Sequence, residues 1–208
     1  YIAKNAKNKS NFLASGDGGD ELFGGYTFRY AKFLSLIKPN SSPLHKIQSY
    51  LSCHERDWVP DQEKVFNSKT NFSWNSINSI FEPFFDNSLS PLDQVFLADY
   101  NGKLLYNFSI IGNKINHFFN LKPVTPILDP KLITYSTQLS SGSKYDSSKN
   151  IGKLPLRKLL TKYNCDSLVS KKKLGFSVNT INLWNSVGKN LCINYLENAR
   201  IVEDGWIN

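Results

Sequence analysis

The stretch from Ser15 to Tyr26, Ser-Gly-Asp-Gly-Gly-Asp-Glu-Leu-Phe-Gly-Gly-Tyr, constrains the fold more than any other part of the chain. It follows the apolar segment 12–14 and concentrates several glycines and three carboxylates in one short turn. A glycine-rich turn between a strand and a helix lets backbone N–H groups approach a phosphate closely. Carboxylates in the same turn would repel a phosphate unless a divalent cation lay between them. The run therefore predicts a nucleotide and metal site at the end of a strand.

The pattern of apolar residues predicts a mostly helical chain around this turn. We expect a short strand at about 11–14 and then a helix from about 21 to 37, capped by Gly19 or Asp20. Further helices are expected over about 44–52, 91–119, 153–162 and 180–196, with short helices and loops over 53–91 and a Ser-rich loop over 140–150. Because almost everything after the first strand is predicted to be helical, the sheet is expected to draw on strands outside the chain.

Composition limits the partners of the chain. The 208 residues allow one good-sized domain or two small ones, and a net charge of +8 suits an anionic partner such as ATP or pyrophosphate. The lysines are mostly scattered, which fits a lysine-rich composition equally well, and no basic and aromatic surface motif indicates nucleic-acid binding. We therefore expect no nucleic-acid partner. No apolar run has membrane-spanning length, so we expect no membrane partner either.

The cysteines indicate no metal or disulfide framework. Cys53, Cys165 and Cys192 lie far apart, and no CxxC pair is present. A reducing compartment is the default for such a chain, and we therefore expect a cytoplasmic protein.

Spacing alone leaves the roles of the turn residues open. Ser15 and Gly16 would offer hydrogen bonds to a nucleotide, whereas Asp20 would either cap the following helix or bind Mg²⁺ opposite a pyrophosphate. We assign Glu21 to the first turn of that helix, where its negative charge would interact favourably with the helix dipole. Without further information, the lysines at 171–173 are interpreted as a solvated basic run.

The Ser15–Tyr26 run resembles the signature of the asparagine synthetase (glutamine-hydrolysing) family, in its C-terminal synthetase domain. Three other segments are similar to motifs of the same family: Lys171–Phe176 with Trp184, Pro126–Asp129 and Lys153–Arg157. All four motifs occur in the family's order and with its spacing over nearly the whole chain.

The resemblance implies an α/β fold of the adenine-nucleotide alpha-hydrolase-like type, the fold of the PP-loop ATP pyrophosphatases. Within it, this chain is expected to be mostly α-helical, with the early strands of the sheet missing. Residues 1–208 would form the C-terminal part of the synthetase domain, without the family's N-terminal glutaminase domain and without its Ser-Gly-Gly-x-Asp-Ser pyrophosphate loop. Since half of the ATP site would then be missing, we expect the chain alone to be inactive.

The resemblance also implies a reaction with ATP and Mg²⁺ as cofactors. The side-chain carboxylate of aspartate would attack the α-phosphorus of ATP, and ammonia derived from glutamine would convert the adenylate into asparagine and AMP. The implied catalytic residues are Asp17, near the acyl centre, and Lys173, which supplies positive charge. The implied nucleotide contacts are Ser15, Gly16 and Gly18, and the implied Mg²⁺ ligand is Asp20. The substrates would be small molecules, and a homodimer is left open.

One region departs from the family pattern and leaves alternatives open. Asn113 and Lys114 stand where the family has an acidic and basic pair, and Lys122 stands where it has Glu. These positions would shape the helical wall around the substrate. A relative that forms a β-lactam, cyclises a peptide or amidates a surface sugar is therefore an alternative, as is an inactive fragment. Asp17 favours ammonia chemistry, since the β-lactam branch has a different residue there.

Overall fold

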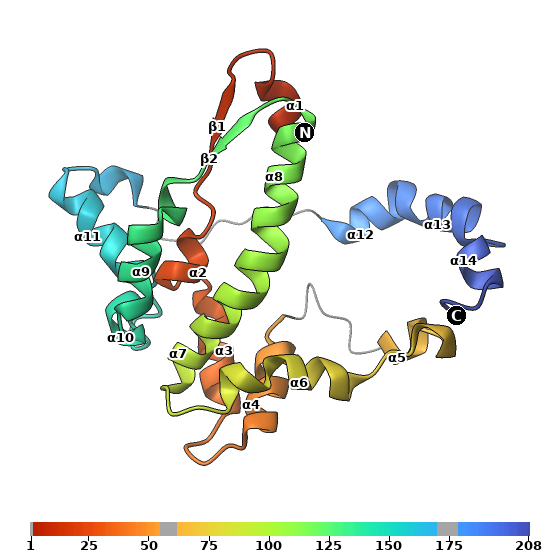
Figure 1. The fold of residues 1–208 in the computed structure, drawn as a ribbon, viewed down its shortest axis with the longest axis horizontal. Helices are drawn as coiled ribbons and strands as arrows, with labels where there is room; N and C mark the ends of the chain where they lie inside the picture. Colours follow the sequence, from red (N-terminus) through yellow and green to blue (C-terminus); the bar gives the residue numbers. More distant parts are fainter. Residues whose placement is uncertain (1, 55–61, 170–178) are drawn as a thin grey trace. The chain divides into compact units, whose positions relative to one another are not determined.

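The computed structural model describes residues 2–54, 62–169 and 179–208, which fall into two compact units (Figure 1). Unit 1 comprises residues 1–53 and 81–169, and unit 2 comprises residues 54–80 and 170–208. The signature turn belongs to unit 1.

Unit 1 contains most of the secondary structure. Its elements in chain order are α1 (Ile2–Ala6), β1 (Phe12–Ala14), α2 (Gly19–Phe23), α3 (Thr27–Leu36), α4 (Pro43–Ser52), the end of α6 (Trp74–Phe85), α7 (Pro91–Ala98), the π-helix η2 (Asp99–Phe108), α8 (Ser109–Phe118), β2 (Lys122–Val124), the 3-10 helix η3 (Pro126–Leu128), α9 (Pro130–Gln138), α10 (Ser141–Lys144), α11 (Leu154–Lys162) and the 3-10 helix η4 (Asp166–Leu168).

Unit 2 is smaller and consists of short helices. Its elements are α5 (Gln62–Val65), the 3-10 helix η1 (Ser68–Thr70), the first part of α6, α12 (Thr180–Leu183), the π-helix η5 (Trp184–Gly188), α13 (Lys189–Leu196) and α14 (Arg200–Glu203). Phe66 pairs with Ile207 in an antiparallel bridge, and the ammonium of Lys69 lies 4.9 Å from the centre of the Trp206 ring. These contacts hold the C-terminal end of the chain within unit 2.

The sheet consists of β1 and β2, which run parallel with Phe12 opposite Lys122 and Ala14 opposite Val124. β2 also contacts α8, and Figure 1 shows the long α8 beside both strands. The expected first strand is confirmed. β2 was not predicted, because three residues with a central Pro123 do not have the pattern of a strand. β1 thus has one partner within the chain, and the expectation that the sheet also draws on strands outside the chain stays a prediction. Helices with a small parallel sheet agree with the predicted α/β class, whereas the PP-loop type of fold stays a prediction.

Three helices begin with the same local device. Ser42, Ser90 and Asp129 each accept a backbone N–H with the side chain and each precede a proline at the first helical position of α4, α7 and α9. The side-chain oxygen replaces a missing helical acceptor, and the proline lacks the N–H that would be unsatisfied there. These helix starts can be read from sequence, and the predicted helix over 44–52 is confirmed within one residue.

The predicted helix from 21 to 37 is broken after its first turn. Gly24 has φ of 75°, in the left-handed region, and α2 ends there before α3 begins at Thr27. Glycine terminates helices in this conformation because it has no Cβ to clash. The predicted helical stretch over 91–119 is confirmed as α7, η2 and α8, with a π-helical middle.

Aromatic side chains fill the interior of unit 1. The rings of Tyr30 and Phe96 meet edge to face with centres 5.0 Å apart, and Phe85 packs against both Phe33 and Tyr50. A second cluster joins Leu22 and Phe23 of α2 to Leu104 of η2, and Ile127, Leu128, Leu132 and Leu156 pack around it. The core therefore holds α2 firmly between elements that lie far apart in the sequence.

The segment 140–150 is more structured than expected. It contains α10 and a bridge between Asp146 and Ile151, and it buries both Lys144 and Tyr145. Tyr145 packs against Tyr30, with the ring centres 5.3 Å apart. Its serines suggested a solvated loop, and the prediction was wrong because the segment contributes side chains to the core. No helix in the described part of the chain has the length and hydropathy to cross a membrane.

Candidate active site

The signature turn begins where β1 ends. Ser15 extends the strand pairing by donating its backbone N–H to the carbonyl of Val124, at 3.0 Å. The turn thus leaves the carboxyl end of a parallel strand, where ligands bind in open α/β sheets. The predicted site residues Ser15, Gly16, Asp17, Gly18 and Asp20 all lie between this strand end and the first turn of α2.

The first half of the turn faces solvent. Gly16 and Asp17 are exposed, and a Cβ added to Gly16 would have no atom within 4 Å. The Ser15 hydroxyl donates to Oδ2 of Asp17 at 2.8 Å. On the other side, a Cβ built on Gly112 of α8 would lie 4.0 Å from the same Asp17 oxygen. The carboxylate of Asp17 is therefore oriented by Ser15, flanked by α8 and accessible to a ligand.

The second half of the turn is buried. Gly18 has φ of 86°, and a Cβ there would lie 2.3 Å from Cδ2 of Leu128. Gly18 is also the N-cap residue of α2 and provides no side-chain cap, so the prediction that Gly19 or Asp20 caps this helix is wrong. The contact between Gly18 and Leu128 brings two of the sequence motifs together. Close packing accounts for this glycine, and its predicted nucleotide contact stays a prediction.

Asp20 forms an ion pair that the sequence did not predict. Its Oδ1 lies 2.8 Å from the ammonium of Lys153, and the carboxylate packs so closely on Gly25 that a Cβ there would lie 1.7 Å from Oδ1. Lys153 also donates its backbone N–H to the carbonyl of Phe23 at 2.9 Å, and it has φ of 58°. This segment thus satisfies a carbonyl at the end of α2 and holds the Asp20 carboxylate. The assignment of Asp20 to Mg²⁺ stays a prediction.

The packing of Gly152 on α2 gives a testable expectation for stability. A Cβ on Gly152 would lie 1.9 Å from the carbonyl oxygen of Gly24, which is backbone and cannot rotate away. We expect Gly152→Ala to destabilise the chain by about 1–3 kcal/mol, the usual cost of overpacking. Urea unfolding of the chain measures this change. The control is Gly142→Ala in α10, where a Cβ would meet nothing within 4 Å. Equal stability of the two variants would contradict the close approach.

Glu21 lies in the first turn of α2, as predicted, and its side chain is buried. Its side chain accepts a hydrogen bond from the Tyr26 hydroxyl. Burial raises the pKa of the Glu21 carboxyl, although the Tyr26 hydrogen bond opposes the shift. The Arg29 guanidinium covers the Tyr26 ring, 3.5 Å from its centre.

The same polar cluster continues to η2 and α4. Arg29 forms a buried ion pair with Asp99 at 3.2 Å, and the Tyr50 hydroxyl donates to the same Asp99 oxygen at 2.8 Å. Sequence reasoning missed this cluster, because Asp99 follows Arg29 by 70 positions and Tyr50 by 49. No local spacing rule connects residues so far apart.

The positions that depart from the family pattern lie on α8 and β2. Asn113 and Lys114 are exposed on α8, directly after Gly112, which approaches Asp17. Lys122 is exposed on β2, with its ammonium 5.8 Å from the centre of the Phe12 ring. The unusual residues at 113 and 114 therefore follow the position that flanks the Asp17 carboxylate.

The remaining predicted site residue and the metal prediction find no test in the structure. Lys173 lies in the segment 170–178, outside the described residues. Within residues 2–54, 62–169 and 179–208, no three His, Cys, Asp or Glu side chains gather where they could hold a metal ion.

A glycine-rich turn at the carboxyl end of a parallel strand is typical of a ligand site in an α/β domain, and comparison with known proteins names the family. The pattern of the asparagine synthase family matches residues 1–208, and the chain belongs to that family. Proteins of Mycobacterium bovis and Mycobacterium tuberculosis named "Putative asparagine synthetase (glutamine-hydrolyzing)" are 25% identical over 217 residues, which cover 91% of this chain. The chain matches 33% of the length of these relatives, and no solved structure matches it.

Proposed function

We propose that the chain supplies the acyl-transfer side of an ATP-dependent amide-forming ligase, which adenylates the aspartate side chain and transfers ammonia to give asparagine, AMP and pyrophosphate. The observation that carries the proposal is the exposed Asp17 carboxylate, oriented by the Ser15 hydroxyl at the carboxyl end of β1. Family membership over residues 1–208 supports ATP as the activating cosubstrate.

Each step of this reaction requires a particular group. An incoming ammonium ion must lose a proton before it attacks the acyl-adenylate, and a carboxylate close to the acyl carbon is a suitable base. Asp17 has the exposure that this role needs, and its hydrogen bond with Ser15 fixes one oxygen. Negative charge that gathers on the phosphorus during adenylation requires a cation, a role that the family motif gives to Lys173.

A carboxylate of the turn could hold Mg²⁺ only together with the oxygens of bound phosphates. Mg²⁺ commonly keeps several waters and is bound by one or two carboxylates together with phosphate oxygens. Asp20 of the turn is the carboxylate that would hold it there, although Lys153 already contacts Oδ1 of Asp20. Bound in this way, the ion would neutralise charge on the departing pyrophosphate.

A related ligase that acts on another carboxylate is the second candidate. Asn113 and Lys114 replace an acidic and basic pair directly after Gly112, the position that flanks Asp17. A wall with different charges would recognise a different substrate, such as the precursor of a β-lactam, a peptide or a surface sugar. The shared part of both candidates is adenylation followed by amide formation.

Pyrophosphate release distinguishes the candidates. The protein that contains this chain is incubated with ATP, Mg²⁺ and an ammonium salt. Release of pyrophosphate and AMP is then compared among aspartate, glutamate, β-alanine derivatives and a control without acid. We expect aspartate to give the largest release, together with asparagine. Release with another acid alone would favour the second candidate. The absence of release with every acid, while an authentic asparagine synthetase is active in the same assay, would refute both.

A further inference from the structure

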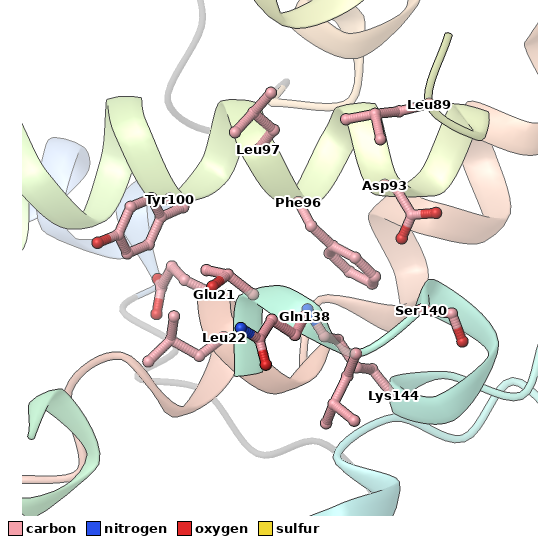
Figure 2. Close-up of a pocket in the computed structure, with 12 residues that line it drawn as sticks. Glu21, Leu22, Leu89, Asp93, Phe96, Leu97, Tyr100, Gln138, Ser140 and Lys144 are labelled. Carbon is pink, nitrogen blue, oxygen red and sulfur yellow. The ribbon is translucent and has the colours of Figure 1, made fainter. Parts of the chain in front are cut away.

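A pocket of about 270 Å³ lies among α2, α7, η2, the end of α9 and α10 in unit 1 (Figure 2). Its lining is mainly apolar and includes Leu22, Phe96, Leu97, Tyr100 and Leu139. Small-molecule sites have this character, with apolar walls and a few polar groups that fix the orientation of the ligand. Glu21 and Leu22 of the signature run line the pocket, whereas the predicted site residues Ser15 to Asp20 do not.

The acidic groups of the pocket are already engaged by the protein. The two carboxylate oxygens of Asp93 accept hydrogen bonds from the Ser141 backbone N–H at 2.8 Å and from the Ser90 hydroxyl at 2.5 Å. Glu21 accepts a hydrogen bond from the Tyr26 hydroxyl. These donors hold both carboxylates in fixed positions in the pocket wall.

The pocket lining also includes a basic side chain, Lys144 of α10. Its side chain is 4% exposed and its ammonium lies 5.0 Å from the centre of the Phe96 ring, below which Figure 2 shows it. Within the described part of the chain it forms no ion pair and no hydrogen bond, although the charge of Asp93 is near enough to act on it. Burial lowers the pKa of Lys144, and Asp93 opposes the shift. A buried ammonium with no carboxylate in hydrogen-bond contact is costly, and an anion bound beside it would relieve that cost.

We propose that this pocket binds a small monocarboxylic acid with an apolar body. The carboxylate would pair with the ammonium of Lys144, and an aromatic or branched aliphatic body would lie against Leu22, Phe96 and Tyr100. The volume favours a compact metabolite over a nucleotide or a peptide, and the inference does not depend on the reaction proposed for the signature turn.

Three ligands of one shape and different charge test the proposal on the unmodified chain. Binding of 3-phenylpropionate, neutral 3-phenylpropanamide and cationic 3-phenylpropylamine is measured by calorimetry and by NMR. We expect the acid to bind at least tenfold more tightly than the amide or the amine, and to shift the amide resonances of Leu139 and Ser140. Equal affinities, no binding of the acid, or shifts confined to other parts of the chain would each overturn the proposal.

A variant pair gives a second test. Lys144→Met keeps the length and apolar stem of the side chain, and we expect it to lower the affinity for the acid to that for the amide. Lys149→Met removes the same charge from an exposed side chain and should leave the affinity unchanged. Since Lys144→Met removes a buried charge, its thermal midpoint should equal or exceed that of the parent. A folded Lys144→Met chain that binds the acid as tightly as the parent would contradict the proposal.

Discussion

Replacing Asp99 with Ala is expected to destabilise unit 1 by about 3–5 kcal/mol, because it removes the carboxylate that pairs with the buried charge of Arg29. Both side chains of this pair are almost fully buried, at 5% and 1% exposure. The change also removes the acceptor of the Tyr50 hydroxyl. Burial, together with the charge of Asp99, raises the pKa of Tyr50, so this group stays a neutral donor that needs an acceptor.

Hydrogen exchange in increasing urea measures the loss of stability within unit 1 itself. The four tryptophans all belong to unit 2, so Trp fluorescence would not report on the aromatic core of unit 1. Peptides from α3 and α4 contain Arg29 and Tyr50 and should lose protection at lower urea in the variant. The double variant Arg29→Met/Asp99→Leu should recover much of the loss, since an apolar pair leaves no buried charge. A single variant as stable as the parent would contradict the buried pair.

The change Asp17→Asn is expected to lower amide formation by about 10²–10⁴-fold while adenylation continues, if the carboxylate acts as the base for ammonium. Asparagine keeps the shape and one oxygen that accepts from the Ser15 hydroxyl, so the turn should stay folded. Exchange of labelled pyrophosphate into ATP reports adenylation, and asparagine formation reports the second step. The two rates should separate in this variant.

Two further variants complete the Asp17 test. Asp17→Glu retains a carboxylate and should retain part of the amide-forming rate. Asp86→Asn makes the same chemical change at an exposed aspartate outside the turn and should not alter either rate. Parallel loss of both rates in Asp17→Asn would show that the carboxylate serves adenylation and not the ammonia step.

The sequence predicted those parts of the fold that depend on neighbouring residues. The strand before the turn, the helix over 44–52 and the long helical stretch after Pro91 all follow from local spacing, and the structure confirms them. The break at Gly24 and the strand Lys122–Val124 were missed. The break could have been predicted from Gly24, but the helical pattern of the apolar residues around it outweighed that signal. The strand β2 exists because β1 supplies its hydrogen bonds.

The candidate site was predicted to a similar extent. The motif located Ser15, Asp17 and Asp20 in one turn, because their order along the chain is also their order in space. It gave no indication that Lys153 would pair with Asp20, or that Glu21 would turn inward to Tyr26. Such contacts depend on how distant helices pack, and the packing of α11 against α2 has no signature in the sequence of either helix.

The two-stranded sheet has a consequence for the dynamics of the turn. Parallel strands are usually covered on both faces, and two short strands alone are only marginally stable. Here β1 and β2 have three residues each, and Phe12 and Val124 are 56% and 40% exposed. Local opening of this pair would free Ser15 and Asp17 together while α2 stays anchored by its buried core. The Asp17 carboxylate therefore lies between a weakly held strand and a firmly held helix, and a partner that covers the strands would also set the position of this carboxylate.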